Sequence, residues 1–155
     1  MPAAPRVLVV EDEDAIRALL VAALRREPFE VDAAGDGAAA LLLTSVHEYA
    51  VIVLDLMMPR VSGFEFLEAF RRVAPQSRSV VIVVTAFDDG MVARLSADAV
   101  HAIVRKPFDV GQLVAIVREI AGTWSAHRQA AEKRSGGEDA AGPATEDAGA
   151  PLIQA

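Results

Sequence analysis

Short aliphatic runs alternate with longer amphipathic stretches along the chain up to Ile120. Three runs are rich in β-branched residues and apolar at consecutive positions: Val7–Val10, Val51–Leu54 and Val80–Val84. This pattern is typical of central strands in a parallel sheet that helices cover on both faces. Two weaker candidate strands span Glu30–Ala34 and Ala102–Arg105.

The stretches between the strands have the length and periodicity of amphipathic helices. They are Ala15–Arg26, Ala38–Val46, Phe64–Val73, Gly90–Ala97 and Val110–Ile120. Strand and helix alternate five times, and right-handed crossovers place helices on both faces of such a sheet. The pattern predicts an α/β fold with a doubly wound, five-stranded parallel sheet.

The composition changes after Ile120. From Gly122 to Ala155 the chain is rich in Ala, Gly, Glu, Asp and Pro, and Trp124 is the only large anchor before Leu152. Such a segment buries too little apolar area to offset its ordering entropy. We expect a domain over 1–121 and a flexible Ala/Gly/Glu-rich tail over 122–155, with no effector domain.

Charge and composition exclude several classes of function. The net charge of −7 disfavours direct binding to nucleic acid or to an anionic membrane. The lack of cysteine excludes disulfides, thiolate metal sites and thiol catalysis. No apolar run is long enough for a signal peptide or for the ~18 residues of a membrane span. We expect a soluble, cytoplasmic protein without membrane insertion.

Polar side chains follow four of the five predicted strands. Glu11 and Asp12 follow the first, Asp55 the third, Thr85 the fourth and Lys106 the fifth. Ligand sites in open α/β sheets lie at the carboxyl ends of the strands, so these side chains are expected to converge.

Three carboxylates in one crevice repel each other unless a cation compensates them, because two like charges ~4 Å apart interact by ~4 kcal/mol at a dielectric near 20. Oxygen ligands without His or Cys suit Mg²⁺. The ion would keep Asp55 nucleophilic, so that it could form an acyl phosphate. Lys106 would neutralise the transferred group, and the hydroxyl of Thr85 would contact its oxygens.

Four ordered motifs resemble the receiver domain of two-component response regulators. They are Val-Val-Glu-Asp-Glu at 9–13, Leu-Asp-Leu-Met-Met-Pro at 54–59 followed by Gly63, Thr-Ala at 85–86, and Lys-Pro-Phe at 106–108. The resemblance covers roughly Arg6 to Ala121. It implies a flavodoxin-like (βα)5 fold with strand order 2-1-3-4-5, as in the chemotaxis receiver.

The resemblance also implies a magnesium site. Asp12 and Asp55 would ligate Mg²⁺ directly, together with the backbone carbonyl of Met57. Glu11 stands where the family more often has Asp, and it would act through a metal-bound water. Asp55 would be the phosphoacceptor.

Around the phosphoryl group, the resemblance implies that Thr85 hydrogen-bonds an oxygen, that Lys106 forms the ion pair and that the Lys106–Pro107 peptide bond is cis. Two positions depart from the family. Ile103 stands where Phe or Tyr is usual, so the usual coupling between an aromatic ring and the threonine cannot operate. Ala97–Asp98–Ala99 replaces a common Gly-Ala turn and would reshape the output face.

These observations favour a stand-alone response regulator in a His-to-Asp phosphorelay, a switch and not an enzyme. A histidine kinase or a histidine phosphotransfer protein would phosphorylate Asp55. A downstream protein would then bind the face formed by the fourth helix, fifth strand and fifth helix.

Three alternatives have different requirements. A phosphorylation-independent pseudo-receiver is compatible with Ile103, although the retained acids, threonine and lysine speak against it. Phosphatases with an aspartyl nucleophile resemble one another in a second Asp two residues later, where this chain has Met57. A flavodoxin-like FMN carrier needs a phosphate-binding loop after the first strand, where residues 11–14 are all acidic.

Overall fold

Strands and helices alternate in the computed structural model, which describes residues 3–86, 89–95, 99–136 and 153–154. The elements, in chain order, are β1 (Arg6–Val10), α1 (Asp14–Arg25), β2 (Glu30–Ala34), α2 (Gly37–Val46), β3 (Val51–Leu54), α3 (Gly63–Val73), β4 (Val80–Thr85), α4 (Asp89–Val92), β5 (Ala102–Arg105), α5 (Val110–Gly136) and β6 (Ile153–Gln154). The five predicted strands are all present, with bounds within one residue of the prediction.

The described strands form one parallel sheet in the order β2-β1-β3-β4-β5-β6. The first five confirm the predicted order 2-1-3-4-5 and the flavodoxin-like fold. The last strand was not predicted. In it, Ile153 and Gln154 pair with Ala102 and Ile103 of β5, so the predicted five-stranded sheet gains a short sixth strand.

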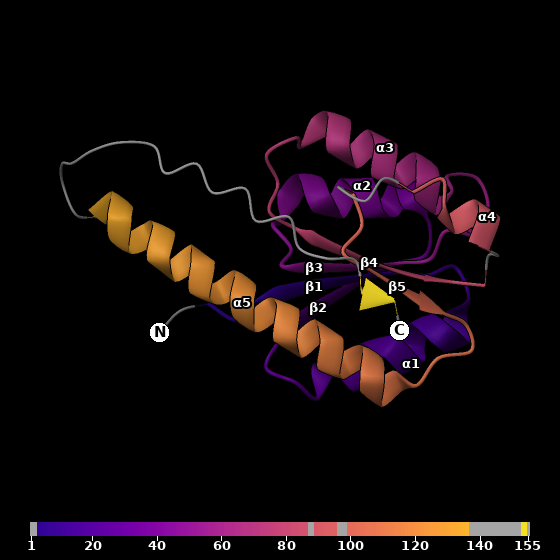
Figure 1. The fold of residues 1–155 in the computed structure, drawn as a ribbon, viewed down its shortest axis with the longest axis horizontal. Helices are drawn as coiled ribbons and strands as arrows, with labels where there is room; N and C mark the ends of the chain where they lie inside the picture. Colours follow the sequence, from indigo (N-terminus) through magenta and orange to yellow (C-terminus); the bar gives the residue numbers. More distant parts are fainter. Residues whose placement is uncertain (1–2, 87–88, 96–98, 137–152, 155) are drawn as a thin grey trace.

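Helices cover both faces of the sheet (Figure 1), with α1 and α5 on one side and α2 and α3 on the other. Successive residues of a strand point to opposite faces. Val7 and Val9 accordingly pack with residues of α1 and α5, whereas Leu8 and Val10 pack with residues of α2 and α3. Burial on both sides explains why the central strands read as unbroken apolar runs.

The fourth helix is shorter than predicted. It ends at Val92, and a turn follows in which the amide of Leu95 donates to the Val92 carbonyl at 3.0 Å. The predicted helix over Gly90–Ala97 is therefore wrong for 93–95. Residues 96–98, which include most of the Ala97–Asp98–Ala99 departure, lie outside the described residues.

The fifth helix is much longer than predicted, and the expectation of a flexible tail is wrong for residues 122–136. Helix α5 continues to Gly136 and extends past the end of the sheet (Figure 1). Trp124 packs into the core beneath it, and Arg128 lies over the indole ring at 5.3 Å while pairing with Glu132 one turn on. Composition alone missed this because residues 126–134 consist mainly of strong helix formers (Ala, Arg, Gln, Glu and Lys), which favour a helix even when little area is buried. In the described ranges, no helix has both the length and the apolar character that a membrane crossing needs.

Candidate metal and phosphoryl-transfer site

The site lies at the carboxyl ends of the strands, as the sequence predicted. The sheet hydrogen bonding continues one residue beyond two of these strands. The amide of Glu11 donates to the Ala34 carbonyl at 3.1 Å, and the amide of Asp55 donates to the Val10 carbonyl at 2.9 Å. Both acidic residues are therefore held by backbone bonds to the neighbouring strand, which fixes where their side chains start.

An acidic cluster forms where β1 and β3 end. Glu11, Asp12 and Asp55 each offer a carboxylate oxygen, and these three oxygens lie within 4.8 Å of one another. Glu11 is 2% exposed and Asp55 is 3% exposed, whereas Asp12 is partly accessible. Buried carboxylates this close together need a compensating cation or a proton.

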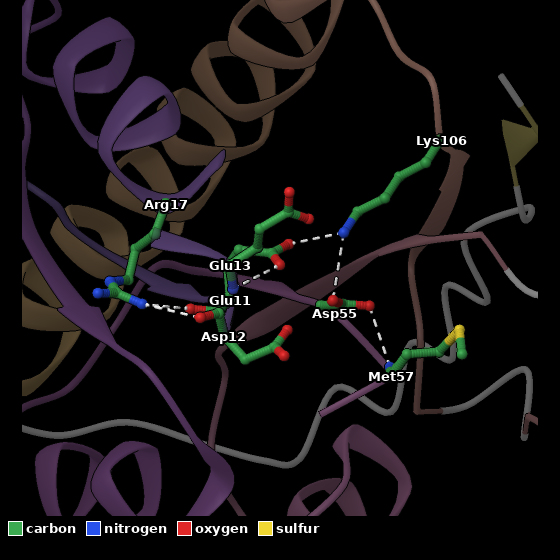
Figure 2. A network of polar contacts seen from close by, with 7 residues as sticks. All are labelled: Glu11, Asp12, Glu13, Arg17, Asp55, Met57 and Lys106. Carbon is green, nitrogen blue, oxygen red and sulfur yellow. Dashed lines mark hydrogen bonds and ion pairs between the residues drawn. The ribbon is translucent and has the colours of Figure 1, made fainter. Parts of the chain in front are cut away.

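Lys106 provides part of that compensation from the loop after β5 (Figure 2). Its ammonium donates to Glu11 Oε2 at 2.9 Å and to Asp55 Oδ2 at 3.2 Å. Burial lowers the pKa of Lys106, but the hydrogen bond that Lys106 donates to Glu11 and the negative charge of Asp55 outweigh this effect and raise the pKa overall. One ammonium thus pairs with two carboxylates, and Asp12 adds a third carboxylate to the cluster.

The pKa of Glu11 is shifted by its burial in this cluster. Burial of its carboxyl, with a contribution from the charge of Asp55, raises its pKa from 4.5 to about 7, although the hydrogen bonds from Lys106 and from the Glu13 amide act in the opposite direction. The cluster therefore holds a proton readily near neutral pH. An all-oxygen donor set with excess negative charge fits a hard dication such as Mg²⁺.

We predict that Glu11 makes the stability of the metal-free protein depend on pH. The folded state keeps the Glu11 proton up to about pH 7, whereas the unfolded chain releases it near 4.5. The folded state therefore binds more protons in this interval, and rising pH lowers the free energy of unfolding, by up to about 3 kcal/mol. Glu11→Gln removes the titrating group, so this part of the pH dependence is expected to disappear.

Denaturant unfolding at pH 5 and pH 8 in the presence of a chelator measures this difference. The matched control is Glu13→Gln, which neutralises an exposed neighbouring carboxylate outside the cluster. Wild type and Glu13→Gln should lose more stability between the two pH values than Glu11→Gln. Parallel losses in all three proteins would show that Glu11 does not titrate in this range.

The remaining predicted site residues lie on the same edge of the sheet. The amide of Met57 donates to Asp55 Oδ1 at 3.0 Å, which orients the Asp55 carboxylate. Thr85 is fully buried at the end of β4, where its carbonyl accepts from the Lys106 amide at 2.9 Å. The Lys106–Pro107 peptide bond is cis, as the resemblance implied.

Ile103 lies on β5, away from the acidic cluster. It pairs with Val83 of β4 and packs on the sheet face covered by α2 and α3. Since it is largely buried in this core cluster, it fills core volume at the position where the family usually has an aromatic ring.

Arg17 supports the site and was missed by the sequence analysis. Its guanidinium donates to the backbone carbonyls of Glu11 at 2.9 Å and Asp12 at 3.4 Å, and it also pairs with Asp14 (Figure 2 shows the carbonyl contacts). These bonds tie the loop after β1 to the first turns of α1. The sequence signal for Arg17 is a basic residue one turn after a run of acidic residues, but the same position also fits the polar face of an ordinary amphipathic helix.

Gly63 belongs to one of the four motifs, but its packing role was not predicted from the sequence. Its amide donates to the Leu56 carbonyl at 3.1 Å, and a Cβ at this position would lie 2.4 Å from the Asp55 carbonyl oxygen and 2.6 Å from the Leu56 Cα. Both contacts are with backbone that carries the acidic cluster. Ser62, which accepts from the Glu65 amide at 3.2 Å, caps α3 and brings Gly63 to this position.

Comparisons with known proteins agree with the fold. The family model described as the response regulator receiver domain matches residues 7–118. The response regulator ArlR of Staphylococcus aureus is 38% identical over 117 residues, which cover 74% of this chain and 52% of the relative. The chain thus spans about half the length of the curated relatives it matches.

Solved structures give the same result. The response regulator TrrA of Thermotoga maritima, determined in complex with Mg²⁺ and BeF, is 33% identical with a TM-score of 0.65, covering 75% of this chain and 98% of that one. A Francisella response regulator receiver domain is 27% identical with a TM-score of 0.68, covering 77% and 98%. A Vibrio parahaemolyticus receiver domain, 23% identical with a TM-score of 0.74 and covering 82% and 97%, supports the fold alone.

Proposed function

Because this chain belongs to the response regulator receiver domain family, we propose that it is a phosphorylation switch whose phosphoacceptor is Asp55. Receiver domains of two-component systems are phosphorylated by histidine kinases and bind Mg²⁺ at an acidic pocket. The observation that carries the proposal is the contact of Asp55 with both Lys106 and the Met57 amide inside the acidic cluster. The family is a signalling switch and not a classical enzyme family, which disfavours the phosphatase and the FMN carrier.

In the proposed reaction, a carboxylate oxygen of Asp55 attacks the phosphorus of a phosphohistidine on a kinase or a phosphotransfer protein. A P–O bond forms as the P–N bond to the donor breaks, and the product is an acyl phosphate. Asp55 is suited to this role because the Met57 amide fixes one carboxylate oxygen and Lys106 contacts the other. Lys106 then pairs with the added phosphoryl oxygens, and the Thr85 hydroxyl donates to one of them.

The residues present also fit the metal that the family binds. Asp12, Asp55 and the Met57 carbonyl would hold Mg²⁺, with Glu11 acting through a water. When bound, this ion supplies positive charge that keeps Asp55 ionised and offsets the charge of the transferred group. Arg17 keeps the Glu11–Asp12 backbone in place for this arrangement.

We infer that the output is a protein contact on the surface of α4, β5 and α5. Thr85 ends β4 and Lys106 follows β5, so a change at the phosphoryl group reaches both strands directly. Since Ile103 replaces the usual ring, movement of Thr85 would be transmitted here by aliphatic packing, with Val83 as the cross-strand neighbour of Ile103. The output partner is a downstream protein that distinguishes the two states of this surface.

Intact mass spectrometry tests the proposal. We expect the purified chain to gain one labile phosphoryl group from a small phosphodonor in the presence of Mg²⁺, and none when a chelator replaces the metal. The donor-free protein with Mg²⁺ is the control for adventitious adducts. A folded protein that gains no phosphoryl group under any of these conditions would contradict the switch and support a phosphorylation-independent pseudo-receiver.

A further inference from the structure

The edge of the sheet at β5 is covered by residues from a distant part of the chain. Ile153 and Gln154 run parallel to β5 and pair with Ala102 and Ile103 (Figure 1). An edge strand presents N–H and C=O groups that can pair with any extended segment. The β5 edge therefore accepts a strand by backbone pairing, and here that strand is β6.

An apolar groove lies next to this pairing. Its volume is about 870 Å³, and it is bordered by α5 and by the amino ends of β4 and β5. Apolar side chains make up much of its lining, namely Val80, Ala102, Ile116, Ile120, Trp124 and Ala131. Ala102 both lines the groove and pairs with Ile153, so the groove and the paired edge are one continuous surface.

Trp124 gives an independent sign that this surface takes a ligand. The residue lines the groove and is only 9% exposed, yet its indole Nε1 is buried and has no hydrogen-bond partner in the described part of the chain. A buried N–H without an acceptor is energetically unfavourable. An extended peptide in the groove offers backbone carbonyls that can accept this bond.

The chain length allows β6 to belong to the same molecule that provides β5. Sixteen residues, 137–152, connect Gly136 with Ile153, and they can span up to about 55 Å. Helix α5 runs twelve residues beyond Trp124, which corresponds to about 18 Å. The connection is therefore long enough to return along the helix to the β5 edge. Leu152 and Ile153 are adjacent large apolar residues in a stretch that otherwise consists mainly of Ala, Gly, Pro, Glu and Asp.

We propose that the β5 edge and the adjoining α5 groove form a docking surface for an extended apolar segment, and that residues 151–155 of this chain occupy it in cis by strand addition. The docked segment would exclude a partner that needs the same edge. That consequence rests on the proposed output surface, whereas the docking itself does not depend on phosphorylation.

Two probes report on the surface without Mg²⁺ or a phosphodonor. Trp124 is the only tryptophan, so its emission reports on the groove, and amide hydrogen exchange over 100–104 reports on the β5 edge. Truncation after Ala150 and the substitution Ile153→Asp are both expected to speed exchange roughly tenfold and to move the emission to longer wavelength. Ala148→Asp adds the same charge upstream of the segment and should change neither.

A synthetic peptide of residues 148–155 should reverse both changes when added to the truncated chain, and a peptide of reversed sequence should not. Equal exchange and emission in the full and truncated chains would overturn the proposal. Dependence of both signals on protein concentration, with a dimer in sedimentation, would also overturn it, because a second copy would then be the occupant.

Discussion

Asp55→Asn is expected to reduce the phosphoryl adduct to the level seen without a phosphodonor, because the amide oxygen that replaces the carboxylate is not a competent nucleophile. The substitution keeps the size of the side chain and leaves an oxygen that can accept from the Met57 amide. Intact mass after incubation with the donor and Mg²⁺ measures the loss. The fold should survive, since one of three crowded negative charges is removed.

A second readout separates loss of chemistry from loss of structure. In the absence of metal, Asp55→Asn should be at least as stable as wild type, because repulsion with Glu11 falls. Stabilisation by Mg²⁺ should shrink, since a ligand that binds only the folded state stabilises in proportion to its affinity. Asp36→Asn is the matched control, because it changes an aspartate that caps α2 outside the cluster, and asparagine caps helices equally well.

The proposal for Asp55 would be contradicted by an adduct of equal yield on Asp55→Asn. A variant that fails to fold would not explain the loss of an adduct, so unfolding curves must accompany the mass measurement. An Asp36→Asn variant that also loses the adduct would point to a general effect of lost negative charge.

Gly63→Ala is expected to lower both stability and phosphoryl uptake. The added Cβ would lie 2.4 Å from the Asp55 carbonyl oxygen, so either the start of α3 or the backbone that carries Asp55 must move. Overpacking of this kind costs about 1–3 kcal/mol, against a gain of up to about 1 kcal/mol from the helix preference of alanine. Displacement of Asp55 from Lys106 should slow phosphoryl uptake roughly tenfold or more.

Gly122→Ala provides the matched comparison. Gly122 lies within α5, and a Cβ there would meet no heavy atom within 4 Å. This variant should be stabilised by up to about 1 kcal/mol and should take up phosphoryl groups at the wild-type rate. Chemical denaturation and a time course of intact mass measure both properties. Equal stability and equal rates of phosphoryl uptake in Gly63→Ala and Gly122→Ala would show that the close approach of Gly63 to the Asp55 backbone does not affect function.

The site could be predicted from the sequence to the extent that topology determines it. Parallel strands bring their carboxyl ends to one edge, so acids after β1 and β3 and a lysine after β5 had to meet there. What topology leaves open is how the charges are shared. The contact of one Lys106 ammonium with both Glu11 and Asp55, and the raised pKa of Glu11, depend on burial and on distances of a few ångströms.

The end of the chain shows where sequence reasoning failed. Low apolar content predicted a flexible segment from Gly122, but helix propensity and a single buried anchor, Trp124, continue α5 to Gly136. Strand β6 could not be predicted either. A two-residue strand has no periodicity of its own, and its pairing depends on the position of the β5 edge.

Local patterning alone thus determined the alternation of strands and helices, the burial of the sheet on both faces and the four motifs that identify the site. Those features depend on residue type and spacing, which are properties of the chain itself. Only the tertiary structure decided that Gly63 lies against the Asp55 backbone, that Arg17 holds the Glu11 and Asp12 carbonyls, and that β6 covers β5. These contacts join segments through packing distances, and packing distances are not encoded in any local pattern.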